Sequence, residues 1–412
     1  MPTLLETPLP PNSLHFADMG GMISTADILA EQAAQGWSVN EIRTLPELLQ
    51  LRPAWNRLAG QTAGATHFLT LDWLATYWRH FGQDQQLRIL VVATQPQLDG
   101  GATKASLPAA ATIVGVLPMV LRHEQTALGL IRVLTFPLDG WGCFYGPLGP
   151  CPDLTLSHGL KYLRAQSRDY DLLDLRWIDN RQGLGDLCQT MLRSHGFSAV
   201  ERVWFPTAQV DLTTGWDEYW ARRTSHWRTN VRSNLKKLAK LGRLGYLRYR
   251  PRGEEFHEQD PRWDLFEQCV DLAAHSWQGS RADGTTLSHP QVREYLRDAH
   301  QTAARTGALD LNLLYCDGQP VAFAYNYAQF GQVYGLRSGY DPKYKAQGAG
   351  TCLIYHMLED SCRRGDNGLD LGPNNLTSKQ PWLTSVVPSY RYSHFTGRSL
   401  YGWLQWLRWR TG

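Results

Sequence analysis

The chain has 412 residues, and its 41 Lys and Arg residues almost balance its 38 Asp and Glu residues, which leaves a net charge of +3. This length corresponds to two or three domains, and the small net charge argues against a protein that wraps DNA. No apolar run is long enough to span a membrane, and the first residues lack the basic region of a secretory signal. We therefore expect a cytoplasmic globular protein that does not bind DNA.

The cysteines are scattered, with no Cys-x-x-Cys pair and no Cys/His spacing typical of a zinc site. We expect free thiols that behave as small buried hydrophobes, and no metal. A bridge between Cys143 and Cys151 stays open as an alternative, because both lie in one turn-dense loop.

The first half of the chain alternates between helical and strand patterns. Residues 1–36 are rich in Pro, Gly and Ala and are predicted to form a flexible arm. The first helical stretch must bend or break at Pro53. The predicted helices are 48–58, 71–81, 156–167 and 183–194, and the predicted strands are 87–95, 113–122, 130–138 and 170–178.

The second half repeats the order of helices, a β-meander, a helix and a strand. Its predicted strands are 208–212, 308–316, 320–330, 332–340, 368–372 and 389–395, and its predicted helices are 225–243, 262–277, 290–304 and 348–364. No residue-level repeat is visible, so we expect the halves to share only this pattern. The pattern predicts an α/β fold of two fused lobes with mixed sheets.

The segment 333–360 has the strongest functional pattern. A strand ends at Tyr340, and the loop Gln347-Gly348-Ala349-Gly350 opens directly into an apolar-periodic helix. Glycines allow a tight turn and close ligand approach, and the first N–H groups of a helix favour anions such as a pyrophosphate. Lys343 and Lys345 lie just upstream. The spacing is neither a Walker A loop nor Gly-x-Gly-x-x-Gly, and a glycine-rich turn without a ligand is the alternative.

This strand, loop and helix resemble the acyl-CoA signature of the GNAT acyltransferases. The wider order of motifs over about residues 41–396 resembles the FemAB-like, tandem-GNAT branch, including the CelD-type proteins linked to cellulose and exopolysaccharide biosynthesis. The stretches that carry it are 66–82, 87–93, 114–122, 225–243, 275–280 and 368–382. The resemblance implies two GNAT-like lobes with mainly antiparallel sheets: an N-terminal lobe (37–205) and a C-terminal lobe (206–396) that holds the acyl donor.

The resemblance also implies acetyl-CoA or another acyl-CoA as co-substrate. The thioester carbonyl would be polarised by backbone N–H groups of the strand that precedes the glycine loop. The residues expected to bind the acyl-CoA are Arg337, Ser338, Gly339, Gln347, Gly348, Ala349, Gly350 and Thr351. Two positions depart from the family: Gln278 follows Trp277 where relatives commonly have lysine, and Ser378 replaces an aromatic residue.

Acyl transfer to an amine needs a proton acceptor and stabilisation of the developing oxyanion. We predict Asp370, Tyr340 and Lys379 as catalytic residues. Asp370 ends a strand beside the predicted cofactor site, and Lys379 can bind an anion or the oxyanion. Purely structural roles remain the alternative for each. Further candidates are His275, His356, Tyr325, Tyr327 and Tyr334.

Two basic segments are each compatible with more than one binding partner. The helix 225–243 carries Arg and Lys residues away from its apolar stripe, which indicates either a solvated face or an anionic partner. The C-terminal residues 397–412 form a predicted amphipathic helix with Trp and Arg, which docks on the protein or contacts the inner membrane face.

The preferred function is N-acyl transfer from acyl-CoA to a small-molecule or glycan acceptor, such as an amino sugar or a precursor of an envelope polysaccharide. FemAB-type peptidyl transfer from aminoacyl-tRNA is less favoured, because the chain has no long heptad run for the helical arm of those proteins. A catalytically degenerate GNAT scaffold in polysaccharide assembly is the third hypothesis.

Overall fold

The computed structural model describes residues 36–94, 112–126, 129–137, 140–166, 169–279, 286–373 and 375–396. The predicted arm, apart from Gly36, and the predicted C-terminal helix 397–412 lie outside these residues. None of the helices in the described part of the chain is both long and apolar enough to cross a membrane.

The N-terminal lobe is built from the elements predicted for it and one additional strand. In chain order these are β1 (Trp37–Ile42), α2 (Leu45–Gln50), α3 (Arg52–Gln61), α4 (Leu71–Phe81), β2 (Gln85–Thr94), β3 (Ile113–Thr126), β4 (Gly129–Thr135), α5 (Pro152–Ala165), β5 (Leu172–Asp179) and α6 (Leu184–Ser194). The break near Pro53 is confirmed, because this residue lies in the first turn of α3, where its missing N–H costs nothing. The sequence did not predict β1, which pairs with β2 as a half-buried strand.

The C-terminal lobe contains the predicted elements in the predicted order and three that the sequence analysis did not predict: α7, β7 and α12. Its elements are β6 (Val200–Asp211), α7 (Trp216–Ala221), α8 (Ser225–Ala239), β7 (Leu244–Tyr249), α9 (Trp263–His275), α10 (Arg293–Arg305), β8 (Leu309–Cys316), β9 (Gln319–Gln329), β10 (Gln332–Tyr340), the 3₁₀ turn η4 (Pro342–Gln347), α11 (Ala349–Arg364), β11 (Gly368–Asp370), α12 (Leu376–Lys379) and β12 (Ser385–Phe395). The basic helix is shorter than predicted: it ends at Ala239, and Leu241, within the predicted range 225–243, is 51% exposed.

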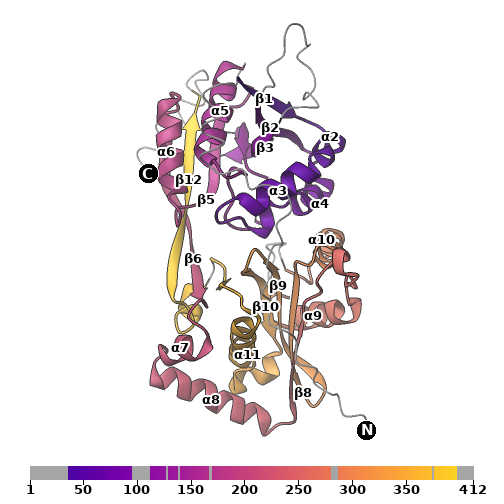
Figure 1. Ribbon diagram of the computed structural model, residues 1–412. Coiled ribbons are helices and arrows are strands. Elements are labelled where there is room, and N and C mark those ends of the chain that lie inside the picture. The colour runs from indigo at the N-terminus through magenta and orange to yellow at the C-terminus, as the bar shows by residue number, and fades with distance from the viewer. Residues whose placement is uncertain are drawn as a thin grey trace.

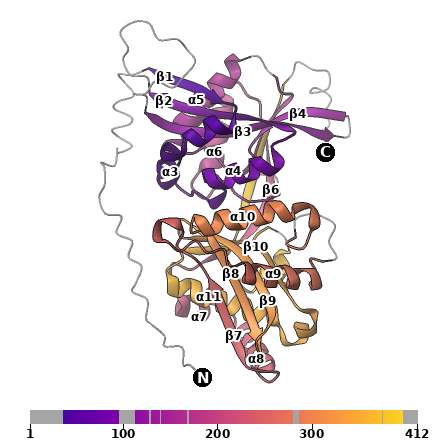
Figure 2. The same cartoon turned by 90° about the vertical axis from the view of Figure 1, so that its right-hand side faces the viewer.

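The described strands form one sheet, in the order β1-β2-β3-β4-β5-β12-β6-β11-β10-β9-β8-β7. Figures 1 and 2 show the two lobes stacked, with β6 and β12 running along one side from one lobe to the other. The predicted boundary between residues 205 and 206 falls inside β6. β12 pairs with β6 and, from Ser389 onward, also with β5 of the N-terminal lobe.

The predicted fold class is confirmed: two lobes share a mixed, mainly antiparallel sheet that helices flank. Each lobe contains a meander, a helix and a strand that returns parallel to the last meander strand. These units are β2-β3-β4-α5-β5 and β8-β9-β10-α11-β11, and the parallel pairs are β4–β5 and β10–β11.

Aspartates occupy matching positions in the two parallel strand pairs. The third and last pair of the parallel register is Thr135 with Asp174 in one lobe and Tyr334 with Asp370 in the other. Both aspartates stand in the sequence Leu-Asp-Leu, at residues 173–175 and 369–371. Because Leu-Asp-Leu also occurs at residues 309–311, the match is one of position in the fold and not a residue-level repeat.

Candidate active site

The open edge of β10 is the first feature of the site. β10 and β11 pair only from Gln332 to Tyr334, and β11 then ends while β10 continues to Tyr340. The N–H of Asp341 donates to the Val321 carbonyl on the β9 side. Since alternate residues of a strand direct their backbone groups to opposite edges, the N–H groups of Ser338 and Tyr340 face the open edge. These donors lie in the segment that the resemblance assigns to the thioester.

Gln278 holds this open edge in place. Its side chain is buried, and Nε2 donates to the Ser338 carbonyl at 2.9 Å. Its Oε1 accepts from the N–H of Leu287 at 3.4 Å. Gln278, which departs from the resemblance, therefore fixes the end of β10 through neutral hydrogen bonds.

The glycine loop opens α11 as predicted. Gly348 has a φ of 68°, and a Cβ there would lie 2.4 Å from Asn234 Nδ2, so both conformation and space require glycine. Among the described residues, no side chain caps the N-terminus of α11, whose first N–H groups have no partner within the helix. Gln347 Oε1 is buried without a hydrogen-bond partner among the described residues. Lys343 and Lys345 are exposed on η4. The loop therefore fits a phosphate group.

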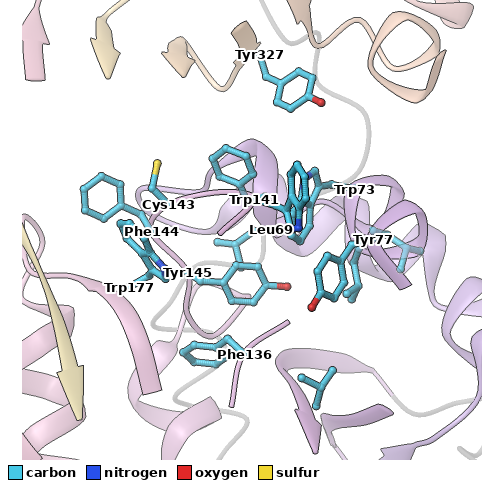
Figure 3. Close-up of a cluster of buried hydrophobic side chains, with 14 of the residues drawn as sticks. Leu69, Trp73, Tyr77, Phe136, Trp141, Cys143, Phe144, Tyr145, Trp177 and Tyr327 are labelled. Atoms are coloured by element: carbon cyan, nitrogen blue, oxygen red, sulfur yellow. The ribbon is translucent and has the colours of Figure 1, made fainter. Parts of the chain in front are cut away.

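A β-bulge turns Arg337 toward the N-terminal lobe. The register between β10 and β9 shifts between Gly335 and Arg337, so that Arg337 pairs with Tyr325 and joins Tyr334 on one face of the sheet. Without the extra residue, strict alternation would direct Arg337 to the other face. Its guanidinium carbon lies 5.3 Å from the ring centroid of Trp141. Figure 3 shows Trp141 and Cys143 of the N-terminal lobe facing Tyr327 of the C-terminal lobe.

Asp370 lies on the same face and is only 2% exposed. The Cys143 thiol donates to its Oδ2 at 3.4 Å, and the Gly372 N–H donates to its Oδ1 at 2.6 Å. Burial raises the pKa of Asp370 above its usual value, although the Gly372 N–H opposes this shift. A carboxyl group with a raised pKa is a suitable proton acceptor.

Lys379 approaches the same turn. Its Nζ donates to the Gly372 carbonyl at 2.9 Å. Burial lowers the pKa of Lys379 to about 8, while the charge of Asp370 opposes this shift. Gly372 therefore contacts both residues, and it does so with a φ of 83°. The structure brings Asp370 and Lys379 together.

Tyr340 does not join these two residues. It pairs with Ala322 and contributes to the core beneath α11, whereas Asp370 bonds to Cys143 of the N-terminal lobe. Tyr334, the partner of Asp370, lies six residues earlier on β10, which corresponds to about 20 Å of strand. The Tyr340 ring instead lies beside the loop: a Cβ at Gly350 would be 3.0 Å from its Cδ1.

Of the other candidates, the histidines lie apart from Asp370, and Tyr334 packs beside it. His275 is exposed and bonds to the Asp271 carbonyl of its own helix, and His356 stacks on Tyr246. Tyr334 is buried beside Asp370, with its hydroxyl 3.5 Å from the Ala65 carbonyl. The sequence analysis did not predict Trp141 or Cys143; their only signal was the turn-dense loop that contains them.

Residues 225–380 match the family model of the acetyltransferase (GNAT) domain. Among solved structures, FemX aligns with a TM-score of 0.58 and 10% identity, over 89% of this chain and 100% of that chain. A conserved protein of unknown function from Bacteroides thetaiotaomicron VPI-5482 aligns with a TM-score of 0.52 and 11% identity, over 87% and 100%. At these identities the likeness concerns the fold. No curated protein sequence matches the chain.

Proposed function

We propose that the protein is an N-acyltransferase that transfers an acyl group, preferably acetyl, from acyl-CoA to an amine. One observation carries the proposal: within the segment that matches a GNAT domain, β10 and β11 separate in front of a glycine-initiated helix. The acceptor that we propose is an amino sugar or an envelope polysaccharide precursor, in line with the resemblance to CelD-type proteins.

Each part of the open edge has a role in this proposal. The N-terminus of α11, from Gly348 to Thr351, holds the pyrophosphate with Lys343 and Lys345 beside it. The acyl-CoA supplies an activated thioester. The N–H groups of Ser338 and Tyr340 donate to the carbonyl oxygen as negative charge develops on it, and Gln278 keeps their strand edge in position.

The acceptor amine enters on the face toward the N-terminal lobe, between Trp141 and Tyr327. Asp370 attracts its ammonium group and accepts a proton from it. The amine, whose nitrogen lone pair is then free, moves along β10 to the thioester held at Ser338 and Tyr340 and attacks it. As the C–N bond forms and the C–S bond breaks, the thiolate of CoA leaves and takes up a proton. Lys379 stabilises the turn that positions Asp370.

Calorimetric titration with acetyl-CoA tests the donor site. Gly348→Asp places a carboxylate where we propose the pyrophosphate, so we expect binding to be lost. Gly365→Asp is the matched control, because Gly365 ends the same helix with a φ of 78° and open space around its Cβ position. Absence of binding by the unaltered protein at millimolar acetyl-CoA, or equal affinities of the two variants, contradicts the proposal.

Peptidyl transfer from aminoacyl-tRNA is the second candidate. The fold-level likeness to FemX over most of the chain favours it. It predicts binding of aminoacyl-tRNA with a steep dependence on salt, because phosphate contacts release counterions. Salt-insensitive binding, or none, removes this candidate. The scaffold hypothesis rests on the Gln278 replacement, and turnover of any acyl-CoA by the purified protein eliminates it.

A further inference from the structure

The exposed face of α8 is strongly basic. Figure 1 shows this helix at the end of the C-terminal lobe, far from the N-terminal lobe. No Asp or Glu occurs between Ser225 and Gly253. Helical spacing directs Val231, Asn234 and Leu238 into the core. The opposite face presents Arg232, Lys236, Lys237 and Lys240, all exposed. In a chain with only a few lysines, this concentration marks the surface as a site for anions.

An apolar groove runs along one flank of this basic face. It lies between α8, β7 and α11, has a volume of about 370 Å³, and is lined mainly by Leu235, Ala239, Leu244 and Tyr246. Lys236 stands at its edge. Just beyond the helix, Leu241 is 51% exposed. Asp317 accepts the Arg243 N–H at 2.6 Å, so this carboxylate is held at the turn that follows the helix.

We propose that the α8 surface, meaning Arg232, Lys236, Lys237, Lys240, Leu241 and the adjoining groove, docks on a membrane of anionic phospholipids. The lysines approach the lipid phosphates, and Leu241 and the groove receive hydrocarbon. Charge complementarity favours any polyanion, but an exposed leucine beside an apolar groove gains from lipid chains and gains nothing from a phosphodiester backbone. This combination selects a membrane surface over RNA.

The docked orientation has a consequence for the proposed active site. Asn234 lies on the flank of α8 that contacts Gly348, so the membrane would meet the helix that borders the glycine loop. An acceptor carried by the membrane would then be held near the lobe that performs the transfer. This consequence rests on the proposed function, whereas the docking itself does not.

Vesicle cosedimentation with the full chain tests the proposal. We expect binding to vesicles of phosphatidylcholine mixed with phosphatidylglycerol, and little binding to phosphatidylcholine alone. Lys236→Gln/Lys240→Gln is expected to weaken the binding by about 20-fold or more, since each charge near the surface contributes about fivefold. Leu241→Ser is expected to weaken it without changing the charge. Lys161→Gln/Arg193→Gln, two exposed positions of the N-terminal lobe, removes the same charge and is expected to leave binding unchanged.

Three results would overturn the proposal. One is unchanged vesicle binding by both α8 variants. Another is loss of binding only when Trp403 and Trp406, in the C-terminal segment, are replaced by Ala. The third is absence of vesicle binding with tight, salt-sensitive binding of tRNA. Titration of the same variants with acetyl-CoA is a separate readout, so a failure of docking is distinguishable from a failure of the proposed donor site.

Discussion

Two buried aspartates occupy equivalent positions in the two lobes, and their surroundings differ. Asp174 and Asp370 each close the parallel register of a strand pair. Burial would raise the pKa of Asp174, but the charges of Arg176 and Arg391 outweigh this and lower it. Arg391 bonds to both of its carboxylate oxygens at 2.7 Å. Asp370 accepts hydrogen bonds from the Cys143 thiol and the Gly372 N–H. Burial raises its pKa, although Gly372, Gln209 and the charge of Arg181 oppose this shift.

The connections that follow β4 and β10 also differ between the two lobes. After β10, the connection is short and ends in the left-handed Gly348 that opens α11. After β4, a longer connection bridges to β3 through Leu148 and Val116, and Thr62 accepts the N–H of Gly149. This connection also delivers Trp141 and Cys143 to the other lobe. The comparison shows one aspartate in ion pairs with two arginines and another that bonds to a thiol and a backbone N–H, which suits the second for the proposed chemistry.

The largest expected effect is on turnover. Asp370→Asn preserves shape but removes the proton acceptor, so we expect acyl transfer to fall by about 10²- to 10⁴-fold. Because the folded pKa lies above the unfolded value of 3.8, stability from Asp370 is lost as pH rises through the folded pKa. The same variant is therefore expected to melt at a higher temperature at pH 7. Unchanged turnover would show that Asp370 is structural, like its counterpart.

Substitution of Asp174 is expected to have the opposite effects: a loss of stability and no loss of donor binding. Asp174→Asn leaves the guanidinium groups of Arg176 and Arg391 without their carboxylate, which we expect to cost about 3–5 kcal/mol of unfolding free energy. Urea denaturation measures this loss. Acetyl-CoA affinity of the folded variant should be retained, because Asp174 lies outside the proposed site. A stabilised Asp174→Asn protein would break the contrast between the two positions.

Lys379 adds a pH dependence in the alkaline range. Its pKa falls from 10.5 in the unfolded chain to about 8 in the folded one, so the unfolded chain holds more protons between these values. Stability from this group therefore rises with pH across that window. Lys379→Met is expected to flatten the rise in melting temperature measured from pH 8 to 10.5 and to lower turnover. An identical pH dependence in the variant would place Lys379 in solvent.

The smallest effect concerns Cys143. Its thiol donates to the ionised carboxylate, so Cys143→Ala should raise the pKa of Asp370 further. We expect the acidic limb of the pH–rate profile to move to higher pH by less than about one unit. Cys143→Ser supplies a stronger donor and should move the limb in the opposite direction. Shifts of the same sign in both variants would mean that the thiol acts through packing alone.

Much of the fold was predictable because it depends on local periodicity. The meander strands, the break at Pro53 and the glycine loop before α11 follow from residue spacing and backbone preference. β1, β7 and the first half of β6 were missed. β1 and β7 are half-buried, and β6 is largely exposed before Thr207, so none of them presents a buried apolar run. Of the predicted catalytic residues, Asp370 and Lys379 lie together, whereas Tyr340 lies on the opposite face with the glycine loop.

The sequence by itself determined the order of the elements and the place of the glycine loop, because hydrophobic periodicity and glycine conformation act over a few residues. Tertiary structure alone decided which carboxyl forms ion pairs with arginines and which bonds to a thiol. The hydrogen bond between Cys143 and Asp370 joins residues 227 positions apart. The one between Thr76 of α4 and Thr302 of α10 joins residues 226 positions apart. Likewise, only the bulge before Arg337 decides which face its guanidinium takes. Such long-range contacts leave no local pattern, since burial and charge compensation depend on neighbours brought together by folding.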